Sequence, residues 1–302
     1  MEIIDFSSGL NKKIILGLGF FDAVHIGHAA LLRHAAVLAK EKGVASGAFT
    51  FNNNPLSFLG GQKQVLTFPE RLTIFEKLGL DYVVAAEMNE NMLALSAQDF
   101  LDRLTNLYDL EAVVAGADYT FGKDAAGNVI FLEQYLKKKG IEFVLFDFVN
   151  ENINRREKIS TSKIRSAIEK GEVGYANSLL SEPYFILGEV IHTKGRGRRL
   201  GFPTANIALD AEKLKLKSGV YLTVTEINGK TYRSLTNVGD RPTFGEELFL
   251  AETYILNFSN DIYGKSIKLS FIKRLRDTIK FESEEAFLRQ LKADIKEAEE
   301  AF

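Results

Sequence analysis

The sequence contains no cysteine among its 302 residues. That absence excludes disulfide bonds, thiolate metal sites and cysteine nucleophiles, and it is consistent with a reducing compartment. Neither sign of charge dominates, because the formal net charge is −2, so composition gives no whole-chain argument for binding nucleic acid or a membrane surface. The first acidic residue precedes the first basic one and no long apolar run follows, so we expect no signal peptide or membrane anchor. The expectation is a cytoplasmic protein.

The first half of the chain alternates between strand-like and helix-like segments. Apolar runs rich in β-branched residues predict strands over 14–18, 44–51, 82–86, 112–115 and 142–148. Helical periodicity is evident from Leu31 to Ala39, and Pro69 and Gly79 mark the start and end of a further helix. This alternation predicts an α/β unit with a parallel sheet, whose ligands bind beyond the carboxyl ends of the strands.

The pattern changes after about residue 182. Closely spaced strands without helices between them are predicted over 185–191, 221–227, 232–237, 253–258 and 267–272. Asn228-Gly229 is typical of a type I′ hairpin, and Ser283 is placed to cap a final helix. We therefore expect two domains, 1–182 and 183–302, the second an antiparallel barrel or sandwich with a terminal helix.

Two of the four histidines stand together in the stretch GLGFFDAVHIGH, residues 17–28. The stretch follows the first predicted strand of the alternating half and leads into a helix, so His25 and His28 would lie beside unpaired backbone N–H groups. Imidazoles there can donate hydrogen bonds to a phosphate and stabilise developing negative charge. The alternative is a capping or packing pair. A zinc site is less favoured, because no cysteine or further clustered histidine supplies more ligands.

The stretch ISTSKIRSAIEKGE begins at residue 159 and places Ser162 and Arg165 near the start of another helix. Hydroxyl and guanidinium donors at a helix N-terminus suit a polyphosphate. Taken alone, the same residues also fit an ordinary helix cap with solvated charges.

Together the two stretches resemble the nucleotidyltransferase superfamily. The likeness is closer to the FAD synthetase module of the bacterial bifunctional riboflavin kinase/FAD synthetases, over residues 17–180. The family pattern G-x-F-D-G-V-H-x-G-H corresponds to residues 19–28, and VVAGADYTFG at 113–122 resembles its G-x-D-[FY]-x-F-G segment. The resemblance implies a Rossmann-like nucleotidyltransferase domain with His25 and His28 as catalytic residues. The nucleotide pocket that it implies contains Phe21, Gly27, Asp118, Phe121, Ser162 and Arg165.

A Gly-rich stretch opens the motifs of the second half. KGRGRRLGFPTANI, residues 194–207, lacks the Gly-Lys-Ser/Thr of a P-loop. Its basic cluster alone could contact nucleic acid, but it is short and the whole chain is slightly negative, so we expect no nucleic-acid partner. The string resembles the riboflavin kinase signature G-x-G-x-x-L-G-[FY]-P-T-A-N. The resemblance implies an antiparallel β-barrel, ATP binding at Gly195 and Gly197, and Mg²⁺ binding at Thr204 and Asn206.

Three further segments resemble the kinase family in order: NVGDRPTFG at 237–245, LAETYILNF at 250–258 and LRDTIKF at 275–281. They imply that Glu252 is the catalytic base. They also imply flavin-binding roles for Arg241, Arg276 and Phe281. The resemblance therefore predicts ATP-dependent phosphorylation of riboflavin to FMN, and adenylylation of FMN to FAD with release of pyrophosphate.

Two departures from the family pattern fall in the first half. Asn52, Asn53 and Asn54 replace a segment that usually carries an acidic or polar side chain and a proline, and Ala23 replaces a glycine. Because both histidines, Asp118 and Arg165 are retained, we expect an active adenylyltransferase. Two alternatives remain: a kinase with a degenerate first half, and a regulatory protein that binds flavin or nucleotide without catalysis.

Overall fold

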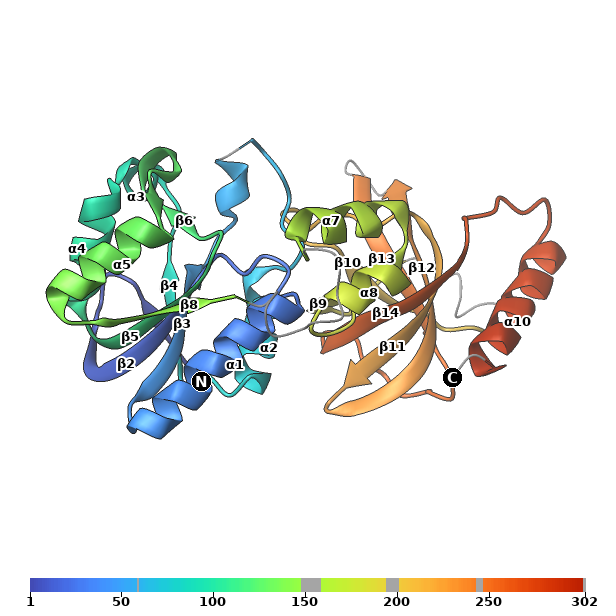
Figure 1. Ribbon diagram of the computed structural model, residues 1–302. Coiled ribbons are helices and arrows are strands. Elements are labelled where there is room, and N and C mark those ends of the chain that lie inside the picture. Colours follow the sequence, from blue (N-terminus) through green and yellow to red (C-terminus); the bar gives the residue numbers. More distant parts are fainter. Residues whose placement is uncertain (59, 148–158, 194–200, 243–246, 301–302) are drawn as a thin grey trace. The chain divides into compact units, whose positions relative to one another are not determined.

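The structure is a computed structural model that describes residues 1–58, 60–147, 159–193, 201–242 and 247–300 (Figure 1). Contacts divide the chain into two compact units, Met1–Thr161 and Ser162–Phe302. This division falls at the start of helix α7 (Thr161–Lys170), so the helical segment before Pro183 is grouped with the second unit. The domain boundary between residues 182 and 183 stays a prediction.

A parallel sheet forms the centre of the first unit. Within the described residues its strands are ordered β1-β4-β3-β2-β5-β8, and every adjacent pair is parallel. The strands are β1 (Glu2–Asp5), β2 (Leu10–Leu18), β3 (Ala45–Phe51), β4 (Tyr82–Ala86), β5 (Tyr108–Gly116) and β8 (Glu142–Phe146). The predicted parallel α/β sheet is confirmed, with β1 as a strand that the sequence analysis did not predict.

Helices cover both faces of this sheet (Figure 1). On β2 the side chains of Ile14 and Leu16 join the core beneath helices α4 and α5. Gly17 faces the other way, where an added Cβ would lie 2.8 Å from Leu32 of α1. Burial on both faces explains why these strands are continuous apolar runs. The remaining elements are α1 (Ile26–Lys42), η1 (Pro55–Ser57), α2 (Phe68–Lys77), α3 (Glu90–Ala94), α4 (Ala97–Leu107), β6 (Thr120–Phe121), η2 (Lys123–Ala125), β7 (Gly127–Asn128) and α5 (Val129–Lys139).

An antiparallel sheet forms the second unit, in the order β10-β13-β12-β11-β14-β9. The N–H of Ile191, just beyond β9, donates to the carbonyl oxygen of Asn206 on β10 at 2.8 Å, which brings the two ends of the sheet together. The predicted antiparallel barrel is confirmed. Its strands are β9 (Phe185–Glu189), β10 (Ala205–Ala208), β11 (Gly219–Ile227), β12 (Lys230–Pro242), β13 (Glu247–Ile255) and β14 (Ser266–Arg276).

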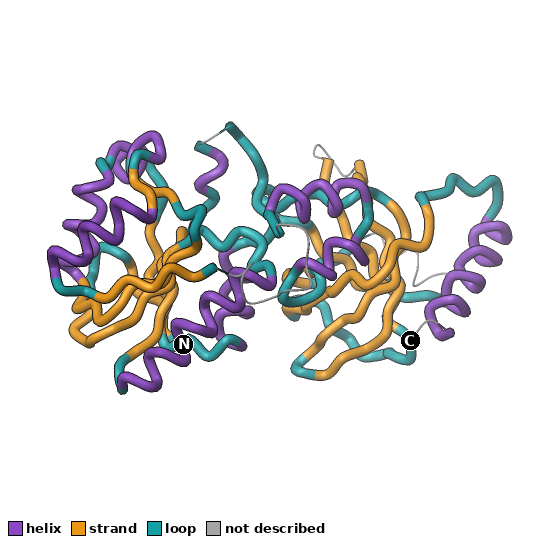
Figure 2. The backbone as a smooth tube through the Cα atoms, in the orientation of Figure 1, coloured by secondary structure: helices purple, strands orange, loops and turns teal. Residues whose placement is uncertain are grey.

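Local signals in the second unit behave as the sequence predicts. Asn228 and Gly229 have φ values of 50° and 75°, the left-handed pair that a type I′ turn requires. The N–H of Ala286 donates to Ser283 Oγ at 3.1 Å, which caps α10 (Glu284–Glu300). Figure 2 separates these helices and strands by colour. In the described part of the chain no helix is long and apolar enough to cross a membrane.

Helix α8 (Val173–Leu179) packs against strand β14 of the barrel. Asn177 Nδ2 donates to the carbonyl oxygen of Phe271 at 2.8 Å, and Asn177 Oδ1 accepts from the N–H of Tyr184 at 2.8 Å. An asparagine side chain thus supplies hydrogen bonds between a helix and a strand that the sequence analysis had assigned to different domains. This contact explains why α8 belongs to the second compact unit.

Candidate functional site

The two histidines meet where β2 ends and α1 begins. His25 is the N-cap of α1, and its Nδ1 accepts from the N–H of His28 at 3.2 Å. The two imidazole rings stack with centroids 3.6 Å apart and an interplanar angle of 18°. Both side chains are partly exposed. The histidine pair is therefore both a helix cap and an accessible group at the positive end of the helix dipole.

Both imidazoles are neutral near pH 7. Burial lowers the pKa of His25 to about 4, although the charge of Asp118 opposes the shift. Burial and the neighbouring His25 lower the pKa of His28 well below its ordinary value. Because Nδ1 of neutral His25 accepts a hydrogen bond, its proton is on Nε2. His28 Nδ1 is buried without a partner, so the opposite edge of that ring is the one able to meet a ligand. The pair can thus offer hydrogen bonds to an anion.

Three other predicted residues lie around this pair. Phe21 is 2% exposed, and its ring centroid is 5.2 Å from that of His28. Gly27 is in the first turn of α1. Asp118 is exposed in the turn after β5, and its charge acts on His25. The carboxyl edge of the sheet therefore gathers these residues, as the parallel arrangement predicts.

The predicted nucleotide pocket also includes Phe121, Ser162 and Arg165. The Phe121 ring is 7% exposed in the core of the first unit, and its centroid is 5.5 Å from that of Phe100. Its ring packs in that core, and the role in the nucleotide pocket that the resemblance implies stays a prediction. Ser162 and Arg165 are on α7, in the second unit, so their roles toward the histidines stay predictions.

The amides that depart from the family pattern have structural partners. Asn53 exchanges two hydrogen bonds, each of 2.8 Å, with the backbone of Met88 beyond β4. Asn54 donates to the carbonyl oxygen of Gln62 at 2.8 Å and accepts from the N–H of Leu56 at 3.1 Å. Ala23 is fully buried. The side chains of Asn53 and Asn54 therefore fix the chain after β3.

A row of polar residues crosses the sheet of the second unit. Glu252 on β13 is the register partner of Asn206 on β10 and of Asn237 on β12. Side chains at paired positions share one face of a sheet, and the adjacent Thr253 is fully buried on the other. Asn206 Nδ2 donates to the carbonyl oxygen of Thr204 at 3.2 Å, while its buried Oδ1 has no hydrogen-bond partner. This unmatched acceptor suits a cation or a ligand donor.

Thr204, two residues before Asn206, lines a cavity of about 320 Å³ together with Val190, Phe258 and Tyr263. Gly195 and Gly197 of the same motif lie outside the described residues. Across the described residues no three His, Asp or Glu side chains form a metal cluster. Magnesium, however, usually takes only one or two protein ligands and shares the phosphates of its substrate, so the oxygens of Thr204 and Asn206 fit that ion.

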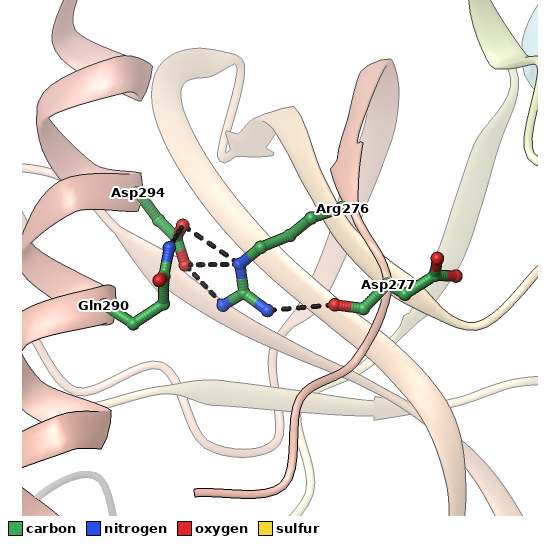
Figure 3. A network of polar contacts seen from close by, with 4 residues as sticks. All are labelled: Arg276, Asp277, Gln290 and Asp294. Atoms are coloured by element: carbon green, nitrogen blue, oxygen red, sulfur yellow. Dashed lines mark hydrogen bonds and ion pairs between the residues drawn. The ribbon is translucent and has the colours of Figure 1, made fainter.

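Two residues of the predicted flavin site, Arg276 and Phe281, contact α10. Arg276, at the end of β14, donates from Nε to Asp294 Oδ1 at 3.1 Å and from Nη2 to Asp294 Oδ2 at 2.5 Å (Figure 3). Gln290 Nε2 donates to the same carboxylate at 2.8 Å. The Phe281 ring meets that of Phe287 at 5.4 Å, edge to face. For Arg241 the structure gives the backbone alone, opposite Leu248 in the sheet.

Sequence reasoning missed Arg71, Asn237 and Asp294. Arg71 shares the buried face of α2 with Ile74 and Phe75, so a charge at i beside apolar residues at i+3 and i+4 was an available signal. Asn237 was quoted within its motif without a role. Asp294, 3% exposed, had no signal of its own, because its partner Arg276 is distant in the sequence.

The two compact units correspond to two different family models. Family models described as FAD synthetase and riboflavin kinase match residues 8–163 and 180–302. The chain is 34% identical to the bifunctional riboflavin kinase/FMN adenylyltransferase of Bacillus subtilis, covering 95% of this chain and 92% of that protein. It is 36% identical to the enzyme of the same description from Listeria monocytogenes, covering 94% and 90%.

Among solved structures, one described as a macrolide-efflux protein from Streptococcus pneumoniae matches with a TM-score of 0.83 and 31% identity, over 97% of both chains. The chain belongs to the family of bifunctional riboflavin kinase/FMN adenylyltransferases, as the resemblance predicts.

Proposed function

We propose that this chain phosphorylates riboflavin to FMN with ATP, and then adenylylates FMN to FAD with release of pyrophosphate. The observation that carries the proposal is that each compact unit has its own polar site built from motif residues. Riboflavin, FMN, FAD and ATP are then its ligands. We also propose a cytoplasmic location, since both steps consume ATP.

In the kinase step, Glu252 takes the proton from the terminal ribityl hydroxyl while that oxygen attacks the γ-phosphorus of ATP, and ADP leaves. A base must lie within about 3 Å of the proton that it removes. Asn206 and Asn237 are the register partners of Glu252 on the two neighbouring strands, so its side chain projects from the same face of the sheet as theirs. Arg241, Arg276 and Phe281 hold the flavin, and Gly195 and Gly197 approach the ATP phosphates.

Thr204 and Asn206 are the residues that would hold Mg²⁺. The unmatched Oδ1 of Asn206 supports this assignment. When bound, the ion neutralises charge on the phosphates, on which phosphoryl transfer mainly depends. The chain's own contribution is to present oxygen ligands beside Glu252 and to leave the remaining ligand positions to substrate and water.

In the adenylylation step, a phosphate oxygen of FMN attacks the α-phosphorus of ATP and the bond to pyrophosphate breaks. His25 and His28 donate hydrogen bonds to the phosphoryl oxygens where negative charge accumulates. Each neutral ring still carries one N–H and acts as a donor, while the FMN phosphate is the nucleophile, so no covalent histidine intermediate forms. The residues that bind ATP in this step are Phe21, Gly27, Asp118, Ser162 and Arg165. The two domains divide between residues 182 and 183.

The decisive experiment separates the two steps with Glu252→Gln. The variant keeps the shape and hydrogen-bonding capacity of the side chain but removes the base, so turnover of riboflavin should fall about 10²–10⁴-fold. Product chromatography should still show FAD when FMN and ATP are supplied, because FMN bypasses the kinase. Normal phosphorylation of riboflavin by the variant would remove Glu252 from the mechanism. A parent chain that makes neither FMN nor FAD would refute the proposed function.

A further inference from the structure

Arg71 is a fully buried charge in the first unit, with none of its surface exposed. Its Nη1 donates to the carbonyl oxygen of Phe20 at 2.8 Å and to Thr50 Oγ1 at 2.6 Å, and its Nη2 donates to the carbonyl oxygen of Phe51 at 2.7 Å. Burial lowers the pKa of Arg71 to about 10, against the charges of Asp22 and Glu70, so the guanidinium stays protonated at neutral pH. Burying such a charge is costly unless its bonds are well placed.

The oxygens that Arg71 binds lie at the carboxyl ends of β2 and β3. Phe20 is the second residue of the loop from β2 to the histidine pair, while Thr50 and Phe51 end β3. Thr50 Oγ1 also donates to the carbonyl oxygen of Phe20 at 2.7 Å, so the guanidinium and the hydroxyl converge on one main-chain atom. Arg71 therefore joins α2, β3 and this loop through a single planar group.

The loop that is held in this way has a strained backbone. Phe21 and Val24 have φ values of 56° and 40°, in the left-handed region that residues other than glycine rarely adopt. Such conformations persist only when their surroundings enforce them. Here the Phe21 ring lies between His28, at 5.2 Å, and Phe75 of α2, at 5.8 Å between centroids. The position of the His28 ring thus depends on the position of the Phe21 ring.

We propose that Arg71 is a positioning residue for adenylyl transfer: it fixes the carbonyl of Phe20, and through it the strained loop that seats Phe21 against His28. The inference rests on the proposed function of the histidine pair. Arg71 itself is buried behind the loop and acts only through it. A lysine retains the charge but is a single point donor, and it cannot span the oxygens of Phe20 and Phe51 as the guanidinium fork does.

Arg71→Lys in the full chain tests this proposal, with Arg33→Lys, an exposed arginine on α1, as the matched control. Well below the melting temperature, we expect Arg71→Lys to lower kcat for FAD formation from FMN at least tenfold, with KM for ATP changed less than threefold. Formation of FMN from riboflavin should stay within twofold, because that step belongs to the second unit. Arg33→Lys should match the parent in both reactions.

The pKa of His25, measured from its imidazole NMR resonances, provides a readout that a general loss of stability would not change. In Arg71→Lys the loosened loop should admit water, so the pKa of His25 measured by NMR should move up toward its ordinary value. Parental kcat for FAD formation in a folded Arg71→Lys would overturn the proposal. Equal losses in both reactions would also overturn it. A parent that makes no FAD refutes the proposed function instead, so the two failures are distinguishable.

Should Arg71→Lys fail to fold, substitutions at Thr50 decide the matter. Thr50→Val removes the hydroxyl that bridges Arg71 and the Phe20 carbonyl, and should lower kcat for FAD formation about fivefold or more. Thr50→Ser restores that hydroxyl and should recover most of the rate. Equal rates for the valine and serine variants would overturn the proposal.

Discussion

Replacing His28 by alanine tests the chemistry of the first unit most directly. The substitution removes a neutral imidazole that stacks on His25 and packs against Phe21. Loss of one donor to developing negative charge costs about 3–4 kcal/mol of transition-state stabilisation, which is roughly 10²–10³ in kcat. The ring contacts that are lost with it should lower the free energy of unfolding by about 1–2 kcal/mol.

The assay follows two products separately. The rate of FAD formation from FMN and ATP should fall roughly 10²–10³-fold. The rate of FMN formation from riboflavin should change less than a few-fold. His34→Ala is the matched control, because His34 is an exposed histidine on the same helix. An unchanged rate of FAD formation in His28→Ala would mean that the histidines serve only as a cap and packing pair.

Two amide substitutions test which edge of the His28 ring acts. Its Nδ1 is buried without a partner, so the reactive donor is at the Nε2 edge. The amide of glutamine can approach the position of Nε2, whereas that of asparagine approaches Nδ1. We therefore expect His28→Gln to retain more FAD formation than His28→Asn. The reverse order would contradict the interpretation that Nε2 is the reactive donor.

Three further predictions concern the second unit. Asp294→Asn should lower the free energy of unfolding by about 2–4 kcal/mol in urea titrations and raise KM for riboflavin, because Arg276 loses the carboxylate charge that holds it. If both the free energy of unfolding and KM stay unchanged, the ion pair is dispensable. Arg165→Ala should raise KM for ATP in adenylylation more than in phosphorylation, since a bidentate bond to polyphosphate is lost; equal effects would indicate a general structural role. A fragment 162–302 should be more stable in urea than a fragment 183–302 by at least about 3 kcal/mol, because the shorter one loses the hydrogen bonds of Asn177 and the apolar contacts of α8. Equal midpoints would show that α8 adds nothing to the stability of the barrel.

Much of the architecture could be predicted because its signals are local. The period of the apolar residues distinguishes strands from helices. Asn228-Gly229 and Ser283 act through their own backbone neighbourhoods, and each adopts the predicted turn or cap. Short strands were harder: β1 and β10 contain four residues each, too few for a period to stand out. The end of β14 at Arg276 was also missed, because its last residues are only partly buried.

The candidate sites were only partly predictable, because only their contiguous motifs give a local signal in the sequence. Contiguous motifs located His25, His28 and Glu252, because each family pattern is a short string. Asn53 could be seen as a departure, but its pairing with Met88 could not, because the two residues are distant in sequence. Phe121 could be assigned to a motif, yet only packing decided that its ring belongs to the core.

The sequence by itself determined the alternation of strands and helices in the first half, the histidine pair at a helix start and the family of the chain, because each depends on residues close together along the chain. The tertiary structure alone decided that Arg71 is buried against the ends of β2 and β3, that Asn206 and Asn237 flank Glu252, and that Asp294 holds Arg276. These pairings join residues far apart in sequence. Their free energy depends on burial and on bond geometry, which exist only once the chain has folded.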